Sequence, residues 1–163
     1  MTRSWISLLA LALSAPAAAQ DGAVDLVRVD KSDRTLTLYA HGQPVRSYTG
    51  IQLGDEPLGA KRFQGDERTP EGRYTLDYGN PQSAYHLSLH ISYPDARDRA
   101  YARAQGRSPG GDIFIHGQPN GYGQTPGDRV AGDWTDGCIA LADAEIEDLW
   151  RLVGDGTAIE ILP

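Results

Sequence analysis

Residues 113–141, with the sequence IFIHGQPNGYGQTPGDRVAGDWTDGCIAL, hold the two side chains around which the rest of the chain is arranged. An apolar strand beginning at Ile113 ends at His116, and a glycine-rich loop leads from there to Cys138. Cys138 is the only cysteine of the protein. A thiol and an imidazole at the two ends of one loop are the minimum parts of a cysteine nucleophile with its base.

The residues beside Cys138 do not activate its thiol. Asp133 and Asp136 flank it, and nearby negative charge raises a thiol pKa above its ordinary value of about 8.5. The thiol therefore needs a proton acceptor, and His116 is the best candidate. Taken alone, His116 would be better explained as a strand-end histidine held by hydrogen bonds. The sequence before Cys138 permits a tight turn at Gly137, which would leave the amides of Gly137 and Cys138 free to stabilise an oxyanion.

The N-terminus has the pattern of a secretory signal. Arg3 supplies the positive charge, residues 5–13 the apolar core, and the alanines at 17–19 the cleavage site. This core is too short to span a bilayer, so we expect no membrane-embedded segment. The sequence predicts a signal peptide at residues 1–19 and one catalytic domain at residues 20–163, exported to the periplasm or cell-wall space.

Composition narrows the possible partners. The chain has 15 basic and 22 acidic residues, a net charge of −7, which argues against nucleic acid as a ligand. Any acidic ligand would need a local basic cluster. The single cysteine cannot form an internal disulfide, so it is either reactive or a buried small hydrophobe. We expect a monomer without cofactors.

Alternation of apolar and polar residues predicts a mostly β chain with a few helices, an α+β fold. Residues 50–68 form a long loop, of the kind that is usually functional or mobile. A short helix is expected at 95–105, and a helix at 143–153 with Asp143 as its N-cap. The expected strands are residues 24–30, 35–39, 45–49, 73–78, 84–93, 113–115 and 158–162.

Four motifs in this order resemble the YkuD-type L,D-transpeptidases. They are RTPEGRY at 68–74, LHISYP at 89–94, GDIFIHG at 111–117 and DWTDGCI at 133–139. The last, followed by EIEDLW at 145–150, is similar to the compact YafK-like branch of this family. The resemblance implies a single YkuD-like mixed β-sandwich or barrel with a C-terminal helix after the nucleophile.

The resemblance also implies a chemistry. Cys138 would be the nucleophile and His116 its general base, while Gly137 and Thr135 would shape the nucleophile turn and its oxyanion hole. The acyl donor would be a peptidoglycan stem peptide. Cys138 would form a thioacyl intermediate that is released by an amine, which is transpeptidation, or by water, which is hydrolysis. A non-catalytic wall-binding module is the alternative of a different class.

Further side chains are candidates for substrate binding. His90 shares a polar strand face with His86, and either could line the cleft. Arg68 belongs to a basic group that could hold a substrate carboxylate or form ordinary ion pairs. Gly117 and Trp134 lie beside the two catalytic candidates. Two histidines without a further ligand at a defined place do not predict a metal site.

Overall fold

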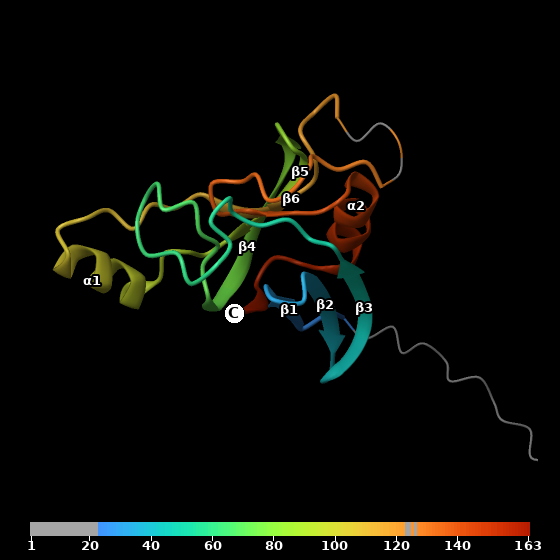
Figure 1. The fold of residues 1–163 in the computed structure, drawn as a ribbon. Coiled ribbons are helices and arrows are strands. Elements are labelled where there is room, and N and C mark those ends of the chain that lie inside the picture. Colours follow the sequence, from blue (N-terminus) through green and yellow to red (C-terminus); the bar gives the residue numbers. More distant parts are fainter. Residues whose placement is uncertain (1–22, 123–124, 126) are drawn as a thin grey trace, which may run out of the picture.

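The computed structural model describes residues 23–122, 125 and 127–163, so the expected signal peptide lies outside the described residues. The described chain forms one eight-stranded mixed sheet with the strand order β3-β2-β1-β8-β4-β5-β6-β7 (Figure 1). The elements in chain order are β1 (Leu26–Asp30), β2 (Thr35–Ala40), β3 (Gln43–Thr49), β4 (Gly72–Ser83), β5 (His86–Ile91), α1 (Ala96–Ala104), β6 (Ile113–His116), β7 (Ile139–Ala140), α2 (Asp143–Leu152) and β8 (Thr157–Leu162).

Strands β1, β2 and β3 form the antiparallel meander that the sequence predicts. Val27 pairs with Leu38 and Val29 with Leu36, and all four side chains are fully buried. The residues between them point the other way, as the alternation requires. Strand β8 lies parallel to β1 on the other side and joins the meander to β4. The predicted mostly β fold is confirmed, with its strands in one curved sheet.

The hairpin of β4 and β5 reaches further than predicted. The expected strand 73–78 continues to Ser83, because register shifts on both sides of Gly79 let β4 bend while it stays paired with β5. Gly79 also lies where a Cβ would meet the Trp150 ring at 2.4 Å, so the strand passes close to α2. As a result, the turn after Ser83 stands at the end of β6 rather than far from it.

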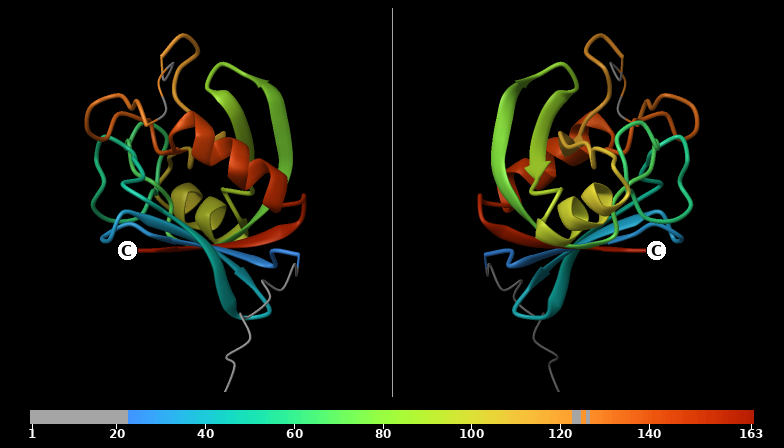
Figure 2. Two further views of the ribbon diagram at one scale, coloured as in Figure 1. Left: turned by 90° about the vertical axis from the view of Figure 1, so that its right-hand side faces the viewer. Right: turned by 90° about the vertical axis from the view of Figure 1, so that its left-hand side faces the viewer.

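The short parallel pair of β6 and β7 brings the two ends of the segment 113–141 together. Ile115 pairs with Ile139 and His116 with Ala140. Figure 2 shows that β4 and β5 rise from the layer of β1, β2 and β8, with α2 lying inside the resulting curve. Neither helix among the described residues has the length and apolar character of a membrane span.

The start of helix α2 differs from the prediction. The N-cap is Ala142, whose N–H donates to Glu145 Oε2 at 2.9 Å, and Asp143 is the first helical residue. Asp143 does not cap the helix because its Oδ1 accepts the N–H of Gln118 at 2.8 Å. The carboxylate thus ties α2 to the chain just after His116. The short helix expected at 95–105 is present as α1, and its N-cap Asp95 accepts the N–H groups of Arg97 and Asp98.

The loop expected at residues 50–68 is held by two buried lysines. Lys31 Nζ donates to the Gly59 carbonyl and pairs with Glu71 at 2.8 Å. Lys61 Nζ pairs with Asp66 at 2.9 Å, and its side chain is only 3% exposed. Because a buried ammonium needs such partners, these contacts fix the path of the loop along the sheet.

Candidate active site

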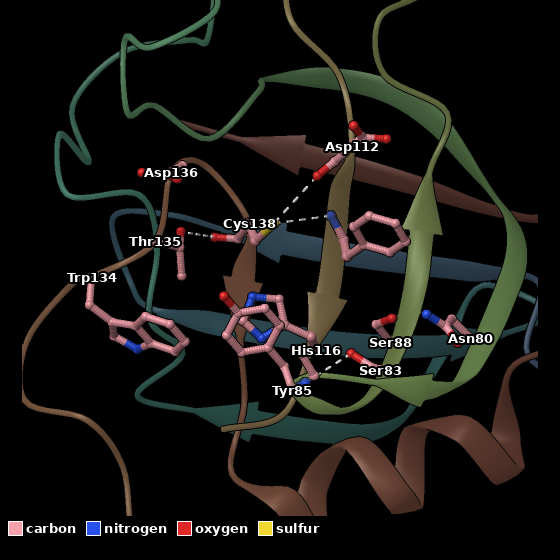
Figure 3. A pocket seen from close by; sticks show the side chains of 12 residues that line it. Asn80, Ser83, Tyr85, Ser88, Asp112, His116, Trp134, Thr135, Asp136 and Cys138 are labelled. Atoms are coloured by element: carbon pink, nitrogen blue, oxygen red, sulfur yellow. Dashed lines mark hydrogen bonds between the residues drawn. The ribbon is translucent and has the colours of Figure 1, made fainter. Parts of the chain in front are cut away.

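His116 and Cys138 line one cavity of about 480 Å³ (Figure 3). His116 comes from the end of β6 and Cys138 from the turn before β7, so the parallel pairing of these strands places them in one wall. Thr135, Trp134 and Tyr85 complete this wall. The structure therefore brings together the two residues that the sequence predicts to be catalytic.

The His116 ring is buried and oriented by a backbone carbonyl. Its Nδ1 lies 2.7 Å from the Gly117 carbonyl oxygen, which can only accept, so we assign the ring proton to Nδ1. The lone pair of Nε2 is then the acceptor of the ring. Burial lowers the pKa of His116, and the Gly117 carbonyl only partly opposes this. His116 is consequently neutral at pH 7, the form in which an imidazole can accept a proton.

The Cys138 thiol is protonated at rest. Burial raises its pKa to about 11, and the charges of Asp136 and Asp112 act in the same direction. The Phe114 N–H donates to Sγ at 3.4 Å, and Sγ lies 3.7 Å from the Asp112 carbonyl. Among the described residues no hydrogen bond joins Sγ to the imidazole. The resting site is thus a neutral pair, and a thiolate requires transfer of the proton.

The turn before Cys138 is fixed by Thr135. Its Oγ1 donates to the Cys138 carbonyl at 2.8 Å and accepts the Gly137 N–H at 3.1 Å. Gly137 has φ 126°, and a Cβ there would lie 2.5 Å from the carbonyl oxygen of Arg68. Only glycine fits this position.

The expectation that both turn amides are free is wrong for Gly137. Its N–H is already bound to the Thr135 hydroxyl, because the turn folds back on that side chain. The Cys138 N–H has no hydrogen-bond partner within the described part of the chain. Of the two amides expected in an oxyanion hole, only that of Cys138 remains available.

Two aromatic rings enclose the His116 imidazole. The Tyr85 ring lies over it at 4.6 Å between centroids with an interplanar angle of 31°. The Trp134 ring is at 5.6 Å and 64°. Tyr85 is 40% exposed whereas His116 is 3% exposed, so these rings separate the imidazole from solvent. The predicted candidate Trp134 therefore lies in the cavity, in contact with the His116 ring.

The other predicted side chains lie outside this cavity. His90 Nδ1 is 2.6 Å from Asp77 Oδ1, and its ring stacks on Tyr78 at 4.6 Å. His86 Nε2 is 2.7 Å from Glu147 Oε1 at the surface of α2. Both histidines thus have partners of their own, and His90 also packs against Phe114, which lines the cavity.

Gly117 and Arg68 act through their backbones. The Gly117 N–H donates to the Tyr85 carbonyl at 3.0 Å, and a Cβ at Gly117 would lie 2.6 Å from Asp143 Oδ1. The Arg68 carbonyl packs against Gly137, as described above. Neither residue lines the cavity, so their contacts shape the positions of His116 and Cys138.

A second cavity, of about 640 Å³, lies on the other side of Cys138. The two cavities share Cys138, Asp112 and Asp136. The long loop supplies Lys61 and Glu67 to the second cavity. The thiol is therefore reached from two directions, one past the imidazole and one along this loop.

Sequence reasoning missed Tyr85, Ser88 and Asp112 as residues of the site. The alternation along residues 84–93 was a usable signal for Ser88, which pairs with His116 across β5 and β6. Tyr85 and Asp112 carry no motif, and their places depend on the bent hairpin and on the backbone before β6. Within the described residues no group of three or more His, Cys, Asp or Glu gathers to hold a metal ion.

Comparison with known proteins identifies the family to which the chain belongs. The model of the YkuD L,D-transpeptidase catalytic domain matches residues 25–161, and the chain belongs to this family. The chain is similar to the putative L,D-transpeptidase YafK of Escherichia coli (strain K12), with 29% identity over 133 residues, 78% of this chain and 46% of YafK.

Solved structures share the fold. The helical cell shape determining protein Pgp2 from Campylobacter jejuni is 30% identical, with a TM-score of 0.67 over 86% of this chain and 48% of Pgp2. An L,D-transpeptidase from Mycobacterium smegmatis is 16% identical, with a TM-score of 0.54 over 87% of this chain and 60% of its own, which shows the fold alone. The chain thus spans about half the length of YafK and Pgp2.

Proposed function

We propose that this protein is an exported L,D-transpeptidase that acts on peptidoglycan stem peptides, with Cys138 as nucleophile and His116 as base. The observation that carries the proposal is the shared cavity of a neutral imidazole and a protonated thiol, with Nδ1 fixed on the Gly117 carbonyl. Membership of the YkuD family supports the substrate class. Residues 1–19 are the proposed export signal, which implies a periplasmic or cell-wall location.

Acylation begins with one proton transfer. His116 Nε2 takes the proton of the Cys138 thiol as the sulfur attacks the carbonyl carbon of the donor peptide. The free Cys138 N–H is placed to donate to the oxyanion that forms. The imidazolium then gives its proton to the departing amine of the terminal D-residue, which leaves a thioester on Sγ.

The two cavities on either side of Cys138 support a second half-reaction. A thioester on Sγ that occupies one cavity leaves the other open to an incoming amine. His116, neutral again, accepts the proton of that amine as it attacks the thioester carbonyl carbon. The C–S bond then breaks, the product leaves with the new amide bond, and the imidazolium returns its proton to the Cys138 thiolate. If water attacks the thioester in place of the amine, the result is hydrolysis, and the same residues act in both reactions until the thioester is released.

The test is incubation with a purified disaccharide-tetrapeptide, with and without an amine acceptor such as a free D-amino acid, followed by mass spectrometry. We expect an exchanged or cross-linked product that contains the acceptor, and no product with Cys138→Ala. Products that are only shortened would assign hydrolysis instead. No product under either condition would contradict the proposal and favour a wall-binding module.

A further inference from the structure

The proposed mechanism leaves a positive charge on a buried ring. When His116 takes the thiol proton it becomes an imidazolium, although its side chain lies among the buried residues of the fold. A buried cation is costly unless nearby groups compensate it. In many cysteine and serine enzymes a carboxylate or amide performs this task on the second ring nitrogen, but here Nδ1 faces only the Gly117 carbonyl.

The charged groups around the ring are engaged elsewhere. Asp112 and Asp136 stand on the thiol side of the cavity, and Asp143 of α2 holds the Gln118 N–H and faces His86. None of these carboxylates forms a hydrogen bond to the imidazole among the described residues. The groups in direct contact with the faces of the ring are aromatic.

We propose that Tyr85 is a positioning residue for the reaction, because the face of its ring stabilises the imidazolium form of His116. The two ring centroids are 4.6 Å apart with an interplanar angle of 31°, which puts the electron-rich face of Tyr85 over the imidazole. Such contacts between a cation and an aromatic face act within about 6 Å and strengthen when water is excluded. Trp134, 5.8 Å from Tyr85, closes the other flank.

The backbone keeps Tyr85 in register with the base. The Tyr85 carbonyl accepts the N–H of Gly117, whose own carbonyl accepts His116 Nδ1–H. Tyr85 N–H is in turn bound to Ser83 Oγ at 3.0 Å. Two successive hydrogen bonds through Gly117 therefore join the backbone of Tyr85 to the His116 ring, and the bond to Ser83 holds Tyr85 in the turn between β4 and β5. The role in catalysis rests on the function proposed above, but the effect on the pKa of His116 does not.

The experiment compares Tyr85→Leu, which is apolar but smaller and has no aromatic face, with Tyr85→Phe, which keeps the aromatic face. NMR of histidine-labelled protein without substrate gives the pKa of His116 in each. We expect Tyr85→Leu to lower this pKa by about one unit and Tyr85→Phe to restore it to within a few tenths. Tyr101→Leu, a change at another exposed tyrosine on α1, is the matched control and leaves the pKa unchanged.

The direction in which the pKa of His116 changes distinguishes stabilisation of the imidazolium by Tyr85 from simple shielding of the ring from water. If Tyr85 only shields the ring from water, its replacement by a smaller side chain hydrates the imidazolium and raises the pKa of His116. A raised or unchanged pKa in Tyr85→Leu therefore overturns the inference. Alkylation of Cys138 by iodoacetamide at pH 7 provides the second readout, expected to slow about tenfold in Tyr85→Leu only. Muropeptide turnover, measured separately, decides the proposed function.

Discussion

Replacing Thr135 by valine tests how the nucleophile turn is held. The substitution keeps the shape of the side chain and removes one hydroxyl, which serves both the Cys138 carbonyl at 2.8 Å and the Gly137 N–H at 3.1 Å. Thr135 is only 5% exposed, so water replaces the lost partners poorly. A buried polar group left unpaired costs about 1 to 3 kcal/mol, and the partly buried Cys138 carbonyl costs less than the buried Gly137 N–H. Thr135→Val therefore lowers the unfolding free energy by roughly 2 to 4 kcal/mol.

Chemical denaturation measures this loss, and thermal denaturation should show Tm lower by roughly 5 to 15 °C. The freed turn also lets Sγ move relative to the imidazole, so we expect acylation of Cys138 to slow by at least about tenfold. Thr135→Ser, which keeps the hydroxyl, is the control and should retain most of both properties. Wild-type stability and acylation rate in Thr135→Val would refute the assignment of the turn to this side chain.

Three further predictions concern the same turn and its thiol. Gly137→Ala forces a Cβ to within 2.5 Å of the Arg68 carbonyl oxygen at φ 126°, and should lower the unfolding free energy by about 3 kcal/mol or more in urea denaturation. Asp133→Asn weakens the paired contacts of Asp133 with Arg34 at 2.6 and 2.7 Å, and should cost about 1 to 2 kcal/mol in the same assay. Because burial raises the pKa of Cys138 to about 11, the rate at which iodoacetamide alkylates Cys138 in His116→Ala should keep rising between pH 8 and 11. A rate that reaches a plateau near pH 8.5 would contradict the burial of the thiol.

The sequence predicted those parts of the site that depend on local order along the chain. His116 ends an apolar strand and Cys138 follows a turn, and both features are visible in residues 113–141. The parallel pairing of β6 with the two-residue strand β7 was not visible, because so short a strand has no periodicity. That pairing is nevertheless what brings the two side chains into one cavity.

Contacts from distant segments decided the rest. Gly79, Asn80 and Pro81 have the composition of a turn, yet β4 continues through them with bulges and carries Tyr85 over His116. Asp143 looks like an N-cap until its carboxylate is seen to hold the Gln118 N–H. In each case a tertiary contact overrides the local preference, and such contacts leave no trace in a single sequence.

The most direct test of the central claim is the mass of the intact protein after brief mixing with a tetrapeptide donor. We expect the wild-type chain to gain the donor acyl group without its terminal D-residue, attached to Cys138. His116→Ala should gain this group far more slowly, and Cys138→Ala should not gain it at all. An equal adduct on Cys138→Ala, or an undiminished rate with His116→Ala, would contradict the assignment of nucleophile and base.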